Sequence, residues 1–188
     1  MNNPPLFNRL RNSRMVLNEV YFWTDTIKDW KKLLAHDDYK KLIIDELRTM
    51  TGKGLVAVYG FVLMPNHLHI VWEMLKINGK EMAHASFNKY TSHEIIKNLK
   101  NNHPHLLPIF AVEEKDRKYL IWQRYPLAII MDNKQKCSQK LDYIHTNPLQ
   151  ERWSLAAREE DYAWSSARFY LTDQYNFGFL THFADRFG

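Results

Sequence analysis

The sequence lacks the features that mark secreted, membrane-bound or nucleotide-binding proteins. It has one cysteine, Cys137, so no disulfide can form within the chain, and we expect this thiol to pack rather than react. No stretch approaches the roughly 18 apolar residues of a membrane span, and residues 1–14 do not resemble a signal peptide. The six glycines form neither a Walker A loop nor a dinucleotide-binding fingerprint. We therefore expect a cytoplasmic protein without a membrane partner or a nucleotide cofactor.

What is present indicates one folded domain with a basic middle section. Of 188 residues, 45% are hydrophobic and 14% aromatic, enough for a sizeable core. Residues 1–14 are predicted to be a flexible basic arm, and residues 15–188 a single domain with a C-terminal extension from about 149. Thirteen Lys and Arg against eight Asp and Glu lie in residues 51–148, within a net charge of +5. This excess suits a polyanionic partner, although an ordinary solvated surface gives the same count.

Hydrophobic periodicity and breaker residues predict an alternation of strands and helices. Strands are expected at residues 16–24, 55–64, 67–74 and near 121–123, and helices at 38–50, 87–99 and 134–147. Up to the last strand, the order is strand, helix, strand, strand, helix, strand. This order predicts an α+β fold with a ferredoxin-like antiparallel sheet and helices mainly on one face.

Two histidines occupy alternate positions in the strand expected at residues 67–74. Side chains two apart on a strand share a face, so His67 and His69 lie side by side while Leu68 points into a core. Paired imidazoles are half of a divalent-metal site, but they are equally compatible with two hydrogen-bonded histidines on a half-exposed sheet. A second such pair, His103 and His105, flanks a proline in a polar stretch and is expected to lie in a loop.

A tyrosine and an asparagine lie four residues apart near the end of the helix expected at residues 134–147. Tyr143 and Asn147 therefore share one helix face, and Pro148 ends the helix. The pair presents a phenol and an amide together. The alternative is a tyrosine packed at a helix edge and an asparagine that stops the helix.

Together these segments resemble a known group of DNA-processing enzymes. Residues 60–69 (GFVLMPNHLH) resemble the His-hydrophobe-His strand of single-tyrosine HUH transposases, and residues 143–149 (YIHTNPL) resemble their nucleophile helix. Residues 161–168 (DYAWSSAR) are similar to a motif of the REP-associated tyrosine transposases, relatives of the insertion-sequence-200 type, and residues 121–124 (IWQR) add a weaker match. The resemblance covers roughly residues 14–170.

The resemblance implies an HUH-type fold and an enzyme that nicks and rejoins single-stranded DNA at hairpins or palindromic repeats through a 5′-phosphotyrosine. Tyr143 would be the nucleophile, and His67, His69 and Asn147 would hold Mg²⁺ or Mn²⁺. The insertion-sequence-200 type usually has Gln where Asn147 stands, so this residue favours the REP-associated branch. A metal suits such chemistry because it polarises the phosphate and assists a poor phenolic nucleophile.

Other features point to DNA contacts outside this site, to a nucleoid-associated location, and to a monomer or a homodimer. Basic and aromatic side chains could contact phosphates or stack on bases. These candidates are Arg9, Arg11, Arg14, Lys89, Lys97, Lys100, Trp122 and Arg124, with Tyr125 beside them. The alternative function is a non-catalytic binder of hairpin or single-stranded nucleic acid on the same scaffold. A rolling-circle replication initiator uses the same chemistry, but the short chain without a helicase-like segment disfavours it.

Overall fold

The computed structural model describes residues 15–172, 174 and 177–188, so the arm predicted at residues 1–14 lies outside the described part. Four strands form one antiparallel sheet in the order β2-β3-β1-β6. They are β1 (Val20–Thr26), β2 (Val56–Met64), β3 (His67–Met74) and β6 (Leu127–Ile130), and the long helices are α1 (Asp37–Gly52), α2 (Ala83–Asn102) and α3 (Lys134–Thr146). Strand order and chain order together give the ferredoxin-like topology, which confirms the predicted fold class.

Short elements complete the chain. A small hairpin joins β4 (Ile77–Asn78) to β5 (Glu81–Met82), and the C-terminal part carries α4 (Ala167–Thr172) and α5 (Ala184–Phe187). Single 3₁₀ turns lie at Lys28–Trp30, Leu33–Ala35, Asn147–Leu149 and Glu159–Asp161, and a longer one at Pro104–Phe110. Within the described residues, no helix is long and apolar enough to cross a membrane.

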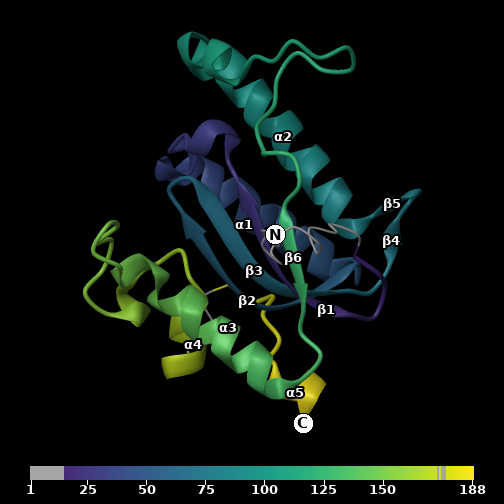
Figure 1. Ribbon diagram of the computed structural model, residues 1–188, viewed down its shortest axis with the longest axis vertical. Helices are drawn as coiled ribbons and strands as arrows, with labels where there is room; N and C mark the ends of the chain where they lie inside the picture. The colour runs from purple at the N-terminus through teal and green to yellow at the C-terminus, as the bar shows by residue number, and fades with distance from the viewer. Residues whose placement is uncertain (1–14, 173, 175–176) are drawn as a thin grey trace, which may run out of the picture.

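The sheet separates two hydrophobic cores, and strand alternation decides which side chains enter each. Leu68 of β3 packs with α1 and α2 on one face, as the alternation predicted, and Ile70 and Trp72 of the same strand join it there. Val71 and residues of α3 form the core on the other face. Figure 1 shows α3 in front of the sheet and α1 behind it. Two of the three long helices therefore share a face, and the helix carrying Tyr143 covers the opposite one.

The predicted element boundaries agree best with the structure in the hairpin of β2 and β3 and at the end of α2. The hairpin strands β2 and β3 lie within one residue of the predicted ranges, and the break after α2 leads into the 3₁₀ turn that contains His105. The prediction of a strand at residues 121–123 is wrong. Those residues pair only through one isolated bridge, Ile27 with Trp122, and the strand β6 begins at Leu127. Tyr125, with φ of 62°, and Pro126, which lacks an N–H, interrupt the ladder between them.

The segment with the sequence YAWSS fastens the C-terminal part to β2. The Tyr162 hydroxyl donates to the Leu63 carbonyl at 2.7 Å, and the Trp164 carbonyl accepts from the Leu63 N–H at 2.9 Å. Ser166 Oγ accepts from the Phe61 N–H at 2.9 Å and lies 2.8 Å from His145 Nε2 on α3. This motif therefore links β2 to α3.

Candidate active site

Strand β3 brings the two predicted histidines together on the face covered by α3. The ring centroids of His67 and His69 lie 4.7 Å apart, and both side chains are buried. Phe22 of β1 stacks on His69 with the centroids 5.3 Å apart. The two imidazoles are thus held beside each other by the strand and by an aromatic neighbour.

Each histidine makes a hydrogen bond at Nδ1, and that of His67 fixes its tautomer. The Asn66 Nδ2 group donates to the Trp30 carbonyl at 3.3 Å, which orients the amide so that its Oδ1 lies 2.7 Å from His67 Nδ1. Because that oxygen can only accept, His67 carries its proton on Nδ1 and a lone pair on Nε2. His69 Nδ1 lies 2.7 Å from Thr24 Oγ1. Metal-ligating histidines are typically oriented by such a bond at their second nitrogen.

Both imidazoles are kept neutral by their surroundings. Burial, with the positive charge of Arg152 in the same direction, lowers the pKa of His67 to about 4. Burial, followed by the charges of His67, Lys140 and Arg152, holds the pKa of His69 well below its usual range. A neutral imidazole is the form that binds metals.

Helix α3 places Tyr143 over the histidines. The Tyr143 ring lies 5.5 Å from that of His69, and the side chain is 40% exposed, open to a substrate. The Asn133 side chain caps the helix start by accepting from the Lys136 N–H at 2.9 Å. Cys137 on the same helix is fully buried, and burial raises the pKa of its thiol to about 12, so it packs there as predicted.

Asn147, at the end of α3, is buried without a hydrogen-bond partner. Its side chain is 0% exposed, and within the described residues neither Oδ1 nor Nδ2 is paired. An unpaired buried amide costs about 1–3 kcal/mol, so such a group calls for a partner such as an ordered water, an ion or a ligand. The described part of the chain contains no cluster of three His, Cys, Asp or Glu side chains that could hold a metal. Imidazole nitrogens and amide oxygens are both donors that divalent ions accept, so His67, His69 and Asn147 suit such an ion by their chemistry.

Several neighbours of the site were not predicted from the sequence. The Lys140 Nζ lies 5.3 Å from the Tyr143 ring centroid, and the position three residues before Tyr143 on a helix could have indicated it. Trp30 and Trp153 lie with ring centroids 6.4 and 5.8 Å from that of His67. No local pattern links either tryptophan to β3, because each comes from a loop or turn far along the chain.

The predicted DNA contacts are mixed in character. Arg9, Arg11 and Arg14 fall outside the described residues. The side chains of Lys89 and Lys97 pair with Glu81 at 2.9 Å and Glu94 at 3.6 Å, and Lys100 lies over the Tyr119 ring. Trp122 requires a correction. It is only 4% exposed, and its indole N–H donates to Thr91 Oγ1 at 2.9 Å, so its ring is packed in the core and not free to stack on a base.

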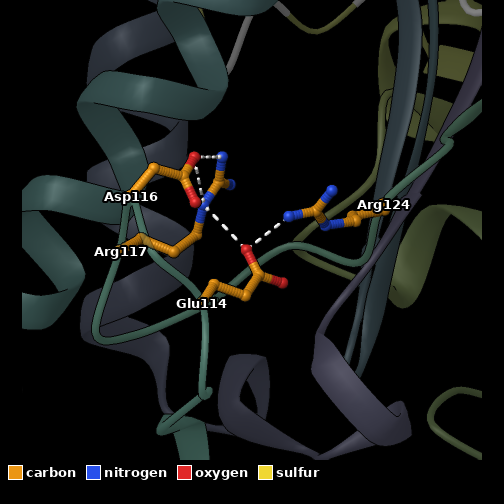
Figure 2. Close-up of polar contacts among 4 residues, drawn as sticks. All are labelled: Glu114, Asp116, Arg117 and Arg124. Carbon is orange, nitrogen blue, oxygen red and sulfur yellow. Dashed lines mark hydrogen bonds and ion pairs between the residues drawn. The ribbon is translucent and has the colours of Figure 1, made fainter.

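Arg124 belongs to an ion-pair network on the surface. Figure 2 shows Arg117 and Arg124 converging on Glu114 from opposite sides, with Arg117 also paired to Asp116 at 2.7 Å. The Arg124 side chain is half-exposed. A substrate phosphate could reach it there.

Comparison with known proteins finds a solved structure with a similar fold. No protein-family model and no curated protein matches the sequence. Among solved structures, the chain is similar to a REP-associated tyrosine transposase bound to a REP hairpin, with a TM-score of 0.59 and 15% sequence identity. The match covers 87% of this chain and 86% of that one. At this identity the likeness establishes a shared fold, and function has to be argued from the site.

Proposed function

We propose that the protein nicks and rejoins single-stranded DNA at or beside a hairpin, as a transposase-like enzyme with Tyr143 as its nucleophile. The observation that carries the proposal is the meeting of Tyr143 with His69, at 5.5 Å between ring centroids, with an unpaired buried amide, that of Asn147, directly after the same helix. A module that only binds nucleic acid has no chemical need for this combination. The solved structure with the similar fold holds a REP hairpin, which supports hairpin DNA from palindromic repeats as the partner.

His67 Nε2, His69 Nε2 and Asn147 Oδ1 are the atoms that would hold a divalent metal, Mg²⁺ or Mn²⁺. When bound, the ion would act as a Lewis acid toward a non-bridging phosphate oxygen. All three donors are neutral, so they would leave the full charge of the ion for the phosphate.

The reaction exchanges one phosphodiester for another. The Tyr143 hydroxyl attacks the phosphorus, a bond from its oxygen to phosphorus forms, and the bond to the 3′-oxygen breaks. The phenolic proton leaves and the 3′-oxygen gains a proton, so the products are a 5′-phosphotyrosine and a free 3′-hydroxyl. The Lys140 ammonium, near the Tyr143 ring, favours negative charge on the attacking oxygen and on the phosphate. Because the phosphotyrosine keeps the bond energy, the reverse attack by a 3′-hydroxyl rejoins DNA without a nucleotide cofactor.

The direct test is covalent capture of DNA. We would incubate the protein with labelled single-stranded DNA carrying palindromic repeats, with Mg²⁺ or Mn²⁺, and separate the products on a denaturing gel beside Tyr143→Phe. The proposal expects a metal-dependent, protein-linked band that the variant lacks, while the affinity of the variant for the hairpin stays within a few-fold. Hairpin binding without an adduct or a shortened strand would favour the non-catalytic binder, and an adduct that persists in the variant would exclude Tyr143.

A further inference from the structure

Trp30 and Tyr125 share a backbone conformation that bulky side chains rarely adopt. Their φ angles are 56° and 62°, in the left-handed region. Within the described residues they are the only aromatic residues with positive φ. Their side chains are 60% and 70% exposed, so burial does little to offset the strain. Strain of this kind concentrates at functional sites, where the backbone holds a side chain for a ligand.

The two aromatic residues line the same cavity. It has a volume of about 230 Å³ and lies between the end of β1 and the segment that leads into β6. Thr24, Thr26, Gln123 and Arg124 also line it. The volume is below the roughly 300–1,000 Å³ of sites for drug-sized ligands. A flat group the size of one nucleobase suits a space of this size that two aromatic residues line.

The cavity adjoins the histidine pair. Thr24, which lines the cavity, holds His69 through the 2.7 Å contact at Nδ1. The Trp30 ring lies 6.4 Å from the His67 ring, and the Trp30 carbonyl accepts the hydrogen bond that orients Asn66 against His67. A group in this cavity would therefore lie next to residues that contact both histidines.

Basic side chains line a second, larger groove that is continuous with this cavity. A larger groove of about 880 Å³ shares Gln123, Arg124, Tyr125 and Pro126 with it and runs along α2 past Lys89 and Arg117. Figure 1 shows the segment before β6 descending beside α2, and residues of both line this groove. The half-exposed Arg124 next to Tyr125 is placed to meet a phosphate of the nucleotide whose base lies in the cavity.

We propose that Trp30 and Tyr125 form a clamp for the unpaired nucleobase that flanks the scissile phosphate. The inference rests on the proposed function and adds what the enzyme holds beside the cut, namely a single-stranded nucleotide adjoining the hairpin. Stacking on aromatic rings suits this task because every base has a π-face, so the clamp holds a base of any sequence. The larger groove then receives the rest of the single strand.

The test compares hairpins with and without a flank, using Tyr143→Phe as the non-cleaving parent. The flank carries 2-aminopurine next to the hairpin, on the 5′ or the 3′ side, and binding is followed by anisotropy and by fluorescence quenching. The parent is expected to bind one flanked hairpin more tightly than the bare hairpin and to quench the probe. Adding Trp30→Ala or Tyr125→Ala should weaken flanked binding by about 5- to 100-fold and remove the quenching, with bare-hairpin affinity unchanged.

Matched variants separate stacking from folding. Trp30→Gly relieves the strain of the positive φ, so this variant should melt at a higher temperature than Trp30→Ala. Both variants should lose the same affinity for the flanked hairpin. Trp30→Phe, which keeps an aromatic ring, should retain most of the affinity for the flanked hairpin. Tyr90→Ala, which removes an exposed aromatic of α2 that lines neither cavity, should bind like the parent.

The outcomes also separate this inference from the proposed function. Equal affinity for bare and flanked hairpins, or flanked binding that survives both alanine substitutions, would overturn the clamp and leave the nicking activity standing. A parent that binds no hairpin of either kind would overturn both.

Discussion

Gly60 of β2 lies directly beneath Leu141 of α3, so closely that a Cβ at residue 60 would overlap the Leu141 Cδ2 atom. It would also lie 3.0 Å from Ser166 Oγ and 3.6 Å from Ile144 Cδ1. The absence of a side chain at Gly60 therefore lets α3 approach the sheet. That approach sets the position of Tyr143 over the histidines on β3.

Gly60→Ala should destabilise the protein and impair cleavage more than DNA binding. The added methyl group must displace the buried Leu141, at about 1–3 kcal/mol of unfolding free energy, and a shifted α3 misplaces Tyr143. Denaturant unfolding and adduct formation measure the two effects. Gly52→Ala is the control, because a Cβ there meets nothing within 4 Å, and replacing glycine in a helix is neutral or stabilising. Full adduct yield in a stably folded Gly60→Ala would show that α3 does not need this close approach.

Asn66→Ala should weaken metal binding although Asn66 does not belong to the proposed ligand set. The variant removes the oxygen that holds the proton of His67 on Nδ1, so Nε2 is no longer fixed as the free lone pair. Loss of such an orienting partner typically costs about 10–100-fold in metal affinity. Titration calorimetry with Mn²⁺ measures the change, and Thr24→Val tests the same point at His69. His103→Ala, a histidine in the turn after α2, should bind metal like the wild type.

Asp25 should make the protein less stable as the pH rises. Burial raises the pKa of this carboxyl to about 8, despite hydrogen bonds from the Thr26 N–H at 2.9 Å and from Asn88 Nδ2 at 2.6 Å. The folded state therefore binds more protons than the unfolded state between about pH 4 and pH 8. The contribution of Asp25 to the free energy of unfolding is fully present below the pKa of the unfolded state. Through this window it falls by up to about 1.4 kcal/mol per pH unit.

Asp25→Asn should remove most of that slope. An amide carries no charge at any pH, and the Asn88 amide can rotate to offer its Oδ1, which is buried and otherwise unpaired. The melting temperature of the variant should exceed that of the wild type at pH 8, with the gap closing toward pH 4. If the melting temperatures of the two proteins change in parallel with pH, Asp25 stays ionised when buried.

Glu114→Gln should tighten DNA binding, since Glu114 holds two arginines that could otherwise meet phosphates (Figure 2). The expected gain is a few-fold in affinity at low salt, with less than about 0.5 kcal/mol change in stability because the network is at the surface. Glu113→Gln makes the same charge change one residue away, outside the network.

Arg124→Gln should act in the opposite direction, with weaker binding and a salt slope smaller by about one. Fluorescence anisotropy over a range of NaCl concentrations measures both quantities. If Glu114→Gln and Glu113→Gln shift the affinity equally, net charge and not release of Arg124 is responsible.

The sequence by itself determined the elements whose patterns are local. Alternation along residues 67–74 placed His67 and His69 on one face and Leu68 on the other, and the structure has them so. Helical spacing put Tyr143 and Asn147 on one side of α3. These features depend only on the periods of a strand and a helix, and a local sequence is enough to fix them.

Only the tertiary structure decided how distant segments meet. Trp122 was predicted to be available for stacking, but its ring is buried in the core and its indole N–H donates to Thr91 of α2. Trp30 gave no signal in the sequence and lies beside His67, while Gly60 matters because of Leu141, which follows 81 residues later. Such contacts arise from packing between elements far apart in the chain, and no local periodicity contains them.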